Sequence, residues 1–138
     1  MKPCDQIDIS KNSGDCFRAV IASILELHLC EVPHVYRDHP DSRDAWKAFQ
    51  RWAATVGFSV VEIDTKYTKE GWFLPAEGQQ CWLCGPSPRF DGVQHAVVGK
   101  WENGQYVMTH DPHPSRAGIP SFEQAGFFIQ IEPSIRNN

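Results

Sequence analysis

The sequence contains no long apolar run and no apolar segment near its start. No stretch approaches the roughly 18 consecutive apolar residues that a membrane-spanning helix needs. The first ten residues, MKPCDQIDIS, lack the apolar core of a secretory signal. We therefore expect no membrane partner, and we expect the protein to be cytoplasmic.

Positive charge is scarce relative to negative charge. The chain has 13 Lys and Arg against 17 Asp and Glu, which gives a formal net charge of −4, and its basic residues form no block. Binding to the phosphates of nucleic acids requires clustered Lys and Arg. Nucleic acid is therefore not expected as the main partner.

The five cysteines are an odd number, which fits a disulfide framework poorly, and we expect free thiols. Cys81 and Cys84 form a lone CxxC in an apolar strand, where positions i and i+3 point to opposite faces and cannot chelate one ion. His110 and Asp111 are adjacent in a strand and also point apart, so a metal site that combines them with His95 is disfavoured. We expect no metal and no cofactor.

The length and composition are those of one globular domain, residues 1–138. Hydrophobic residues make up 41% of the chain and charged residues 22%, and we find no repeat, low-complexity segment or linker. Periodicity and turn residues predict an α+β domain, with helices followed by antiparallel strands. The expected helices are 16 to about 27, with Asp15 at its N-cap, and 43–57, capped by Ser42 and stopped by Gly57; the expected strands are 58–63, 80–84, 94–101, 105–111 and 127–132, and residues 64–79 are expected to be mostly loop.

Cys16 is expected in the first turn of the first helix, which is apolar on nearly every face. The helix dipole and the free backbone N–H groups at a helix start favour a thiolate, the reactive form of cysteine. The preceding Ser13-Gly14-Asp15 segment resembles a loop that leaves the sulfur reachable. A buried structural thiol is the alternative.

His95 and Asp111 have the residue types that a cysteine nucleophile needs as its base and as the group that orients the base. They lie on strands joined at Asn103-Gly104. A two-residue turn there places His95 opposite Pro112 and points Asp111 to the other side of the sheet. A three-residue turn with Gly104 left-handed places His95 directly opposite Asp111. A site that uses both residues therefore predicts the three-residue turn.

A developing oxyanion also needs hydrogen-bond donors. The backbone N–H of Cys16 is one candidate, and a side-chain amide from Gln6 or Asn12 is the other. Arg89, in the loop before His95, is a candidate for binding a carboxylate or phosphate on a substrate.

Tryptophans and the residue before the nucleophile complete the predicted substrate-binding set. Trp82, like Trp72, is a candidate for lining a cleft beside the nucleophile, whereas Trp46 and Trp52 have the spacing of core residues. Asp15, next to Cys16, is grouped with Arg89 and Trp82 as substrate-binding.

Short motifs spread over about residues 4–132 share one family pattern. They are Gly14-Asp15-Cys16-Phe17-Arg18-Ala19, Ala22-Ser23-Ile24-Leu25-Glu26-Leu27, Glu31-Val32-Pro33, Gly85-Pro86-Ser87-Pro88-Arg89, His95-Ala96-Val97-Val98 and His110-Asp111-Pro112-His113-Pro114-Ser115. The pattern resembles small papain-like cysteine peptidase-like proteins of phages and bacteria, distant relatives of the bacteriocin-leader peptidases. The resemblance implies a minimal papain-like domain in which Cys16 is the nucleophile, His95 the base, Asp111 the third member and Gln6 the oxyanion amide. Gln6 lies further before Cys16 than is usual for papain-type sites.

These observations predict a cysteine hydrolase that cleaves a peptide, isopeptide or related amide bond in a peptide or protein substrate. Two alternatives remain open. The same three side chains also serve acyl transfer and deamidation, and the same fold can act as a non-catalytic module that binds a host protein in a phage setting.

Overall fold

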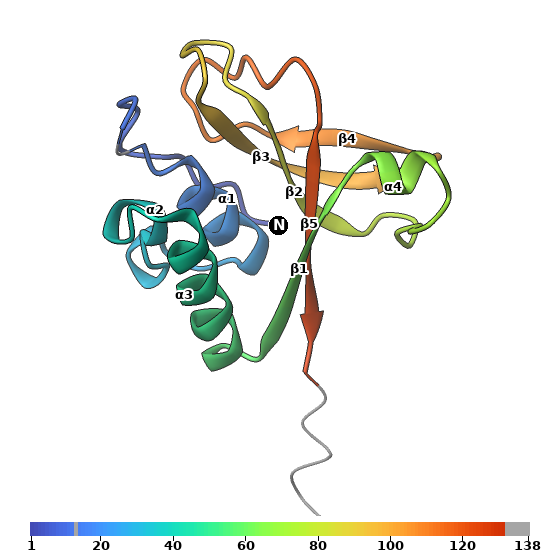
Figure 1. The fold of residues 1–138 in the computed structure, drawn as a ribbon, viewed down its shortest axis with the longest axis horizontal. Helices are drawn as coiled ribbons and strands as arrows, with labels where there is room; N and C mark the ends of the chain where they lie inside the picture. Colours follow the sequence, from blue (N-terminus) through green and yellow to red (C-terminus); the bar gives the residue numbers. More distant parts are fainter. Residues whose placement is uncertain (13, 132–138) are drawn as a thin grey trace, which may run out of the picture.

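The computed structural model describes residues 1–12 and 14–131 and forms an α+β domain (Figure 1). This confirms the predicted α+β class. In chain order its elements are α1 Cys16–Leu25, the 3-10 turn η1 Leu29–Glu31, α2 Val35–Asp38, α3 Ser42–Thr55, β1 Phe58–Asp64, α4 Lys66–Lys69, β2 Gln80–Pro86, β3 Gln94–Glu102, β4 Gln105–His110 and β5 Gln124–Gln130.

The five strands form one antiparallel sheet in the order β1-β5-β2-β3-β4. Helices α1, α2 and α3 gather on one side of this sheet, and α4 lies on the other (Figure 1). Because neighbouring residues of a strand point to opposite faces, Trp82 and Val98 join the core under the helices, whereas Leu83 and Val97 join a second core on the far face.

Helix α1 is the central element that the apolar pattern predicts. Its residues Ala19 to Ser23 are all buried, and Ser23 Oγ is satisfied inside the core by the Ala19 carbonyl and the Cys4 backbone N–H. The helix ends at Leu25, about two residues earlier than predicted, because Glu26 takes a left-handed conformation with φ 57°.

The N-cap residue of α1 is the predicted one, whereas that of α3 is not. Asp15 occupies the N-cap position of α1, but its side chain makes no capping hydrogen bond. At α3 the cap is Asp41 and not Ser42, since the Asp41 carboxylate accepts from the N–H groups of Arg43 and Asp44. Gly57, with φ 94°, follows the end of α3 as predicted.

The predicted strands are present with small shifts in their ends. The last strand begins at Gln124, three residues before the predicted start, and its predicted final residue, 132, lies outside the described residues. The short helices α2 and α4 were not predicted. Each spans four residues, which is too short to show a hydrophobic period.

The β3–β4 hairpin has a two-residue turn, so the predicted three-residue turn is wrong. Glu102 pairs with Gln105, and Asn103 and Gly104 have φ values of 53° and 80°, the positive values that a type I′ turn requires. A bulge lies further along the hairpin, where Gly99 pairs with Met108 but Val98 pairs with His110. The extra residue reverses the faces beyond it, so His95 and Asp111 share a face without the three-residue turn.

Within the described residues, no helix combines the length and apolar character needed to cross a membrane.

Candidate active site

Cys16 is the first residue of α1 and is partly exposed. It lines two adjoining cavities, of about 170 and 600 Å³. Cys16 therefore borders open space on two sides, as a reactive thiol needs and a structural thiol does not.

Asp111 is buried directly after β4, and both of its carboxylate oxygens accept hydrogen bonds. Oδ1 accepts hydrogen bonds from His95 Nε2 at 2.7 Å and from the His113 N–H at 3.0 Å. Oδ2 accepts from the Gly118 N–H at 2.7 Å. With 1% of its surface exposed, Asp111 is held rigidly, and it fixes the His95 ring in turn.

His95, near the start of β3, is 4% exposed and lines both cavities together with Cys16. Burial acts to lower the pKa of His95, but the hydrogen bonds and negative charges of Asp111 and Cys16 outweigh it and raise the pKa to about 9. The imidazolium is therefore the favoured form at neutral pH. Because Nε2 is bound to Asp111, Nδ1 is the ring nitrogen that remains for Cys16.

The pKa of Asp111 moves in the opposite direction. Burial acts to raise this pKa, but the hydrogen bonds from His95, His113 and Gly118 lower it to about 2. Asp111 is thus a carboxylate under all ordinary conditions, and together with His95 it forms a buried charged pair beside the thiol.

The smaller cavity, which we call the basic cavity, is lined by polar and cationic groups. Gln6, Asn12, Lys11, Arg89 and His113 surround Cys16 and His95 there. Arg89 also donates to Ser115 Oγ at 3.2 Å, which holds its guanidinium beside the site.

Gln6 and Asn12, the two candidate oxyanion amides, both line the basic cavity. Gln6 is the more firmly placed of the two. It is buried, its Nε2 donates to the Asp8 carbonyl at 2.8 Å, and its backbone N–H donates to the Pro112 carbonyl at 3.1 Å. Asn12 is exposed.

The larger cavity, which we call the aromatic cavity, lies between the helices and the sheet. Phe17, Tyr36 and Trp46 line it, together with Cys84 and Glu62. Neither Tyr36 nor Glu62 is among the predicted site residues, and Trp46 is predicted to belong to the core. The signal at Glu62 was a charged residue inside an otherwise apolar strand, at a position on the helix-covered face.

Two of the predicted substrate-binding residues are structural instead. Trp82 is fully buried, packs against Gly126 in the core and donates from Nε1 to Glu62 at 2.6 Å. Asp15 is 1% exposed, and its Oδ1 accepts from the N–H groups of Ile7 and Asp8. Neither residue lines the cavities beside Cys16. Trp72 is exposed, and it also lines neither of these two cavities.

The other histidines and cysteines near the site have contacts of their own, although His113 and Cys84 also line the cavities beside Cys16. His110 contacts Asp5 and the Cys4 carbonyl, and His113 contacts Ser115. Cys81 and Cys84 pack in different cores on opposite faces of the sheet, as the strand spacing predicts. Burial is the main cause that raises the pKa of both thiols, that of Cys81 to about 12.

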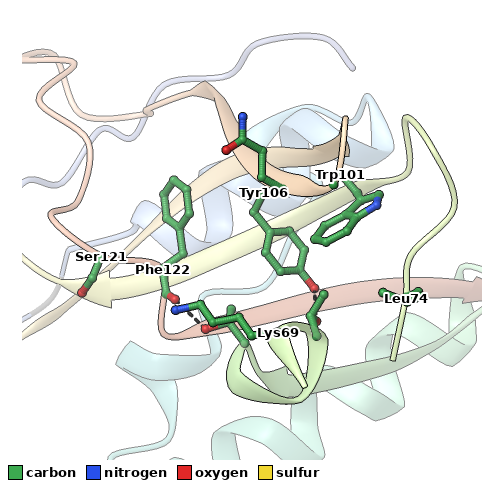
Figure 2. Close-up of a pocket in the computed structure, with 10 residues that line it drawn as sticks. Lys69, Leu74, Trp101, Tyr106, Ser121 and Phe122 are labelled. Carbon is green, nitrogen blue, oxygen red and sulfur yellow. Dashed lines mark hydrogen bonds between the residues drawn. The ribbon is translucent and has the colours of Figure 1, made fainter. Parts of the chain in front are cut away.

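A further cavity of about 590 Å³ lies on the far side of the sheet (Figure 2). Trp101, Tyr106 and Phe122 line it, with Lys69 at its edge and the Tyr106 hydroxyl bound to Thr68. None of its lining residues is a cysteine, a histidine or a carboxylate. It therefore offers no thiol nucleophile and no imidazole or carboxylate base, unlike the cavities around Cys16.

Comparison of the chain with protein-family models, with curated proteins and with solved structures gives no significant match.

Proposed function

We propose that this protein is a cysteine hydrolase with a minimal papain-like fold, acting on a peptide, isopeptide or related amide bond. The observation that carries the proposal is the arrangement around Cys16. A partly exposed cysteine at a helix start shares two cavities with His95, and a buried carboxylate holds that histidine at 2.7 Å.

The architecture supports the papain-like part of the proposal. The nucleophile stands at the first residue of α1, and the base and its partner come from the adjacent strands β3 and β4 or their ends. Helix α1 packs directly on β3 through residues such as Val20 and Val98, so the distance between nucleophile and base is set by core packing.

In the proposed reaction His95 takes the Cys16 proton, and the thiolate attacks the carbonyl carbon of the scissile amide. The tetrahedral intermediate then collapses, the C–N bond breaks, and His95 returns the proton to the departing amine. A water molecule, deprotonated by His95, attacks the resulting thioester, releases the acid and restores the thiol. Asp111 keeps the ring oriented and stabilises its positive charge throughout.

The oxyanion of the intermediate is assigned to the backbone N–H of Cys16 and the side-chain amide of Gln6. The bond from Gln6 Nε2 to the Asp8 carbonyl uses one of the two amide hydrogens and fixes the plane of the group, which leaves the second hydrogen for the substrate. Asn12 is the alternative donor, since it lines the same cavity.

Alkylation by iodoacetamide tests the reactivity of Cys16 directly. Trypsin places Cys16 alone among the cysteines on peptide 12–18, so its labelling can be followed separately from that of the exposed Cys30. At neutral pH we expect Cys16 to react roughly ten-fold faster than Cys30 or more, because its thiolate is paired with His95. His95→Ala should remove this advantage. Even labelling of all exposed thiols in the unaltered protein would contradict the proposal.

Product mass then separates the possible reactions of the same site. Hydrolysis of an amide adds one water across the bond, transfer joins the acyl group to an added amine, and deamidation leaves the chain intact with a side-chain amide converted to acid. If Cys16→Ala retained the full biological effect of the protein, hydrolysis, transfer and deamidation would all be rejected in favour of a non-catalytic binding role.

A further inference from the structure

The two cavities that meet at Cys16 have opposite electrical character. Among the described residues, the basic cavity is lined by the cationic Lys11 and Arg89 and by no carboxylate. His113 also lines it, and burial and the charge of Arg89 lower the pKa of this histidine. Of the residues that the structure describes, Glu62 is the one carboxylate that lines the aromatic cavity, and His95 is the one residue there that can carry positive charge. A substrate lying across Cys16 therefore meets positive charge on one side and negative charge on the other.

The hydrogen bond that Glu62 makes to Trp82 does not require a negative charge on Glu62. It lies on β1 facing the helices, and its Oε2 accepts from Trp82 Nε1 at 2.6 Å. Within residues 1–12 and 14–131, no protein donor is found for its Oε1, and Glu62 is a partly exposed residue that lines the aromatic cavity. A neutral glutamine would satisfy the indole equally well, so the second oxygen and the negative charge are available to a ligand.

Aromatic rings surround this carboxylate. Phe17 and Tyr36 pack edge to face with ring centroids 5.4 Å apart, and Trp46 lines the same cavity. Tyr36 lies close to Glu62, and burial and the charges of Glu62, Cys84 and Cys16 raise the pKa of its phenol. Aromatic faces next to a carboxylate suit an ammonium or guanidinium group, through cation–π contact and ion pairing together.

We propose that the aromatic cavity binds a lysine or arginine side chain of the substrate close to the scissile bond, with Glu62 as the residue that sets this specificity. The inference rests on the proposed hydrolase function, because it describes the substrate of the same nucleophile. Lys11 and Arg89 repel a basic side chain from the opposite cavity, so the charge pattern also fixes the direction in which such a substrate lies.

Charged methanethiosulfonate reagents probe the cavity without a known substrate. The Cys16 thiolate attacks their divalent sulfur, the bond from that sulfur to the sulfonyl group breaks, and a mixed disulfide and methanesulfinate result. The rate is measured on peptide 12–18 with the trimethylammonium-ethyl reagent and with the neutral methyl reagent. For Glu62→Gln we expect the ratio of cationic to neutral rates to fall about five-fold, the size of one partly solvated charge interaction. A change in folding or in thiol activation would alter the rates with the cationic and the neutral reagent by the same factor, so it would leave their ratio unchanged.

Glu70→Gln serves as the matched control, because Glu70 follows α4 and lines neither cavity beside Cys16. It removes the same charge and should leave the ratio unchanged. An unchanged ratio in Glu62→Gln overturns this inference while the proposed function stands. A Cys16 that reacts no faster than Cys30 with the neutral reagent overturns the proposed function, and this inference with it.

Cleavage of a mixed peptide library completes the test. New chain ends are identified by mass spectrometry, and we expect Lys and Arg to be enriched at one position beside the cleaved bond. The enrichment should disappear in Glu62→Gln and persist in Glu70→Gln. Cleavage by the unaltered protein with no preference for basic residues contradicts the inference and leaves the hydrolase function intact.

Discussion

The imidazole of His95 and the carboxylate of Asp111 lie 2.7 Å apart, and both side chains are almost entirely removed from solvent. A buried ionised pair is costly unless every lone pair and proton has a partner. Here both Asp111 oxygens accept hydrogen bonds from the protein. The ring is therefore held in one orientation, which leaves Nδ1 for the hydrogen bond with Cys16.

Asp111→Asn should lower the pKa of His95 from about 9. The amide keeps the size of the side chain but removes the negative charge that favours the imidazolium. NMR titration of the His95 ring measures the shift. Asp5→Asn is the control, since Asp5 contacts His110 and Arg116 and not His95. A His95 pKa that stays near 9 in Asp111→Asn would show that Asp111 is not its main partner.

The stability of the protein should depend on pH in a predictable direction. The pKa of His95 is raised from 6.5 to about 9 on folding, so its contribution is complete below 6.5 and is lost as the pH rises through 9. The pKa of Asp111 is lowered from 3.8 to about 2, so its contribution is complete above 3.8 and is lost as the pH falls through 2.

We therefore expect the free energy of unfolding in urea to be highest between about pH 4 and pH 6.5 and to decline towards pH 9. His95→Gln removes the titrating group, and its decline over the same alkaline range should be clearly smaller. An identical decline in both proteins would assign the effect to other groups.

Gln6→Ala should slow acylation of Cys16 by p-nitrophenyl acetate about 100- to 1000-fold, the usual cost of one oxyanion donor. Alkylation by iodoacetamide forms no oxyanion, so its rate should change little. The ratio of the two rates thus separates oxyanion stabilisation from thiol activation. Asn12→Ala is the matched variant, and a larger effect there than in Gln6→Ala would transfer the role to Asn12.

Gly126→Ala should destabilise the fold by about 1–3 kcal/mol or more. A Cβ at position 126 would lie 1.7 Å from the Trp82 ring, and the indole has no free space to move into because it is fully buried. Urea unfolding measures the loss, with Ser59→Ala on the exposed side of β1 as control. Unchanged stability would mean that Trp82 can leave the core and would return it to the substrate-binding candidates.

Local patterns predicted the parts of the site that depend on neighbours in sequence. The apolar period beginning at Cys16 predicted α1, and the Asn103-Gly104 pair predicted the hairpin that carries His95 and Asp111. Both signals come from helix geometry and turn sterics, which act over a few residues.

The features of the site that local patterns did not predict depend on contacts between residues that are distant in sequence. The bulge that brings His95 and Asp111 to one face lies beside Gly99, where a Cβ would meet Leu83 at 2.3 Å, and no turn rule includes that neighbour. Asp15 has the sequence context of a cap, yet two backbone N–H groups seven and eight residues earlier hold its carboxylate. Such contacts override local preference.

The central claim is that Cys16 forms an acyl-enzyme that His95 helps to make and to resolve. Intact-mass and peptide analysis after mixing with p-nitrophenyl acetate tests it most directly. We expect one acetyl group on peptide 12–18 that forms quickly and is then lost to water, with both steps slowed in His95→Ala. Acetyl groups spread evenly over the exposed thiols, or release of p-nitrophenolate by Cys16→Ala at the rate of the unaltered protein, would contradict it.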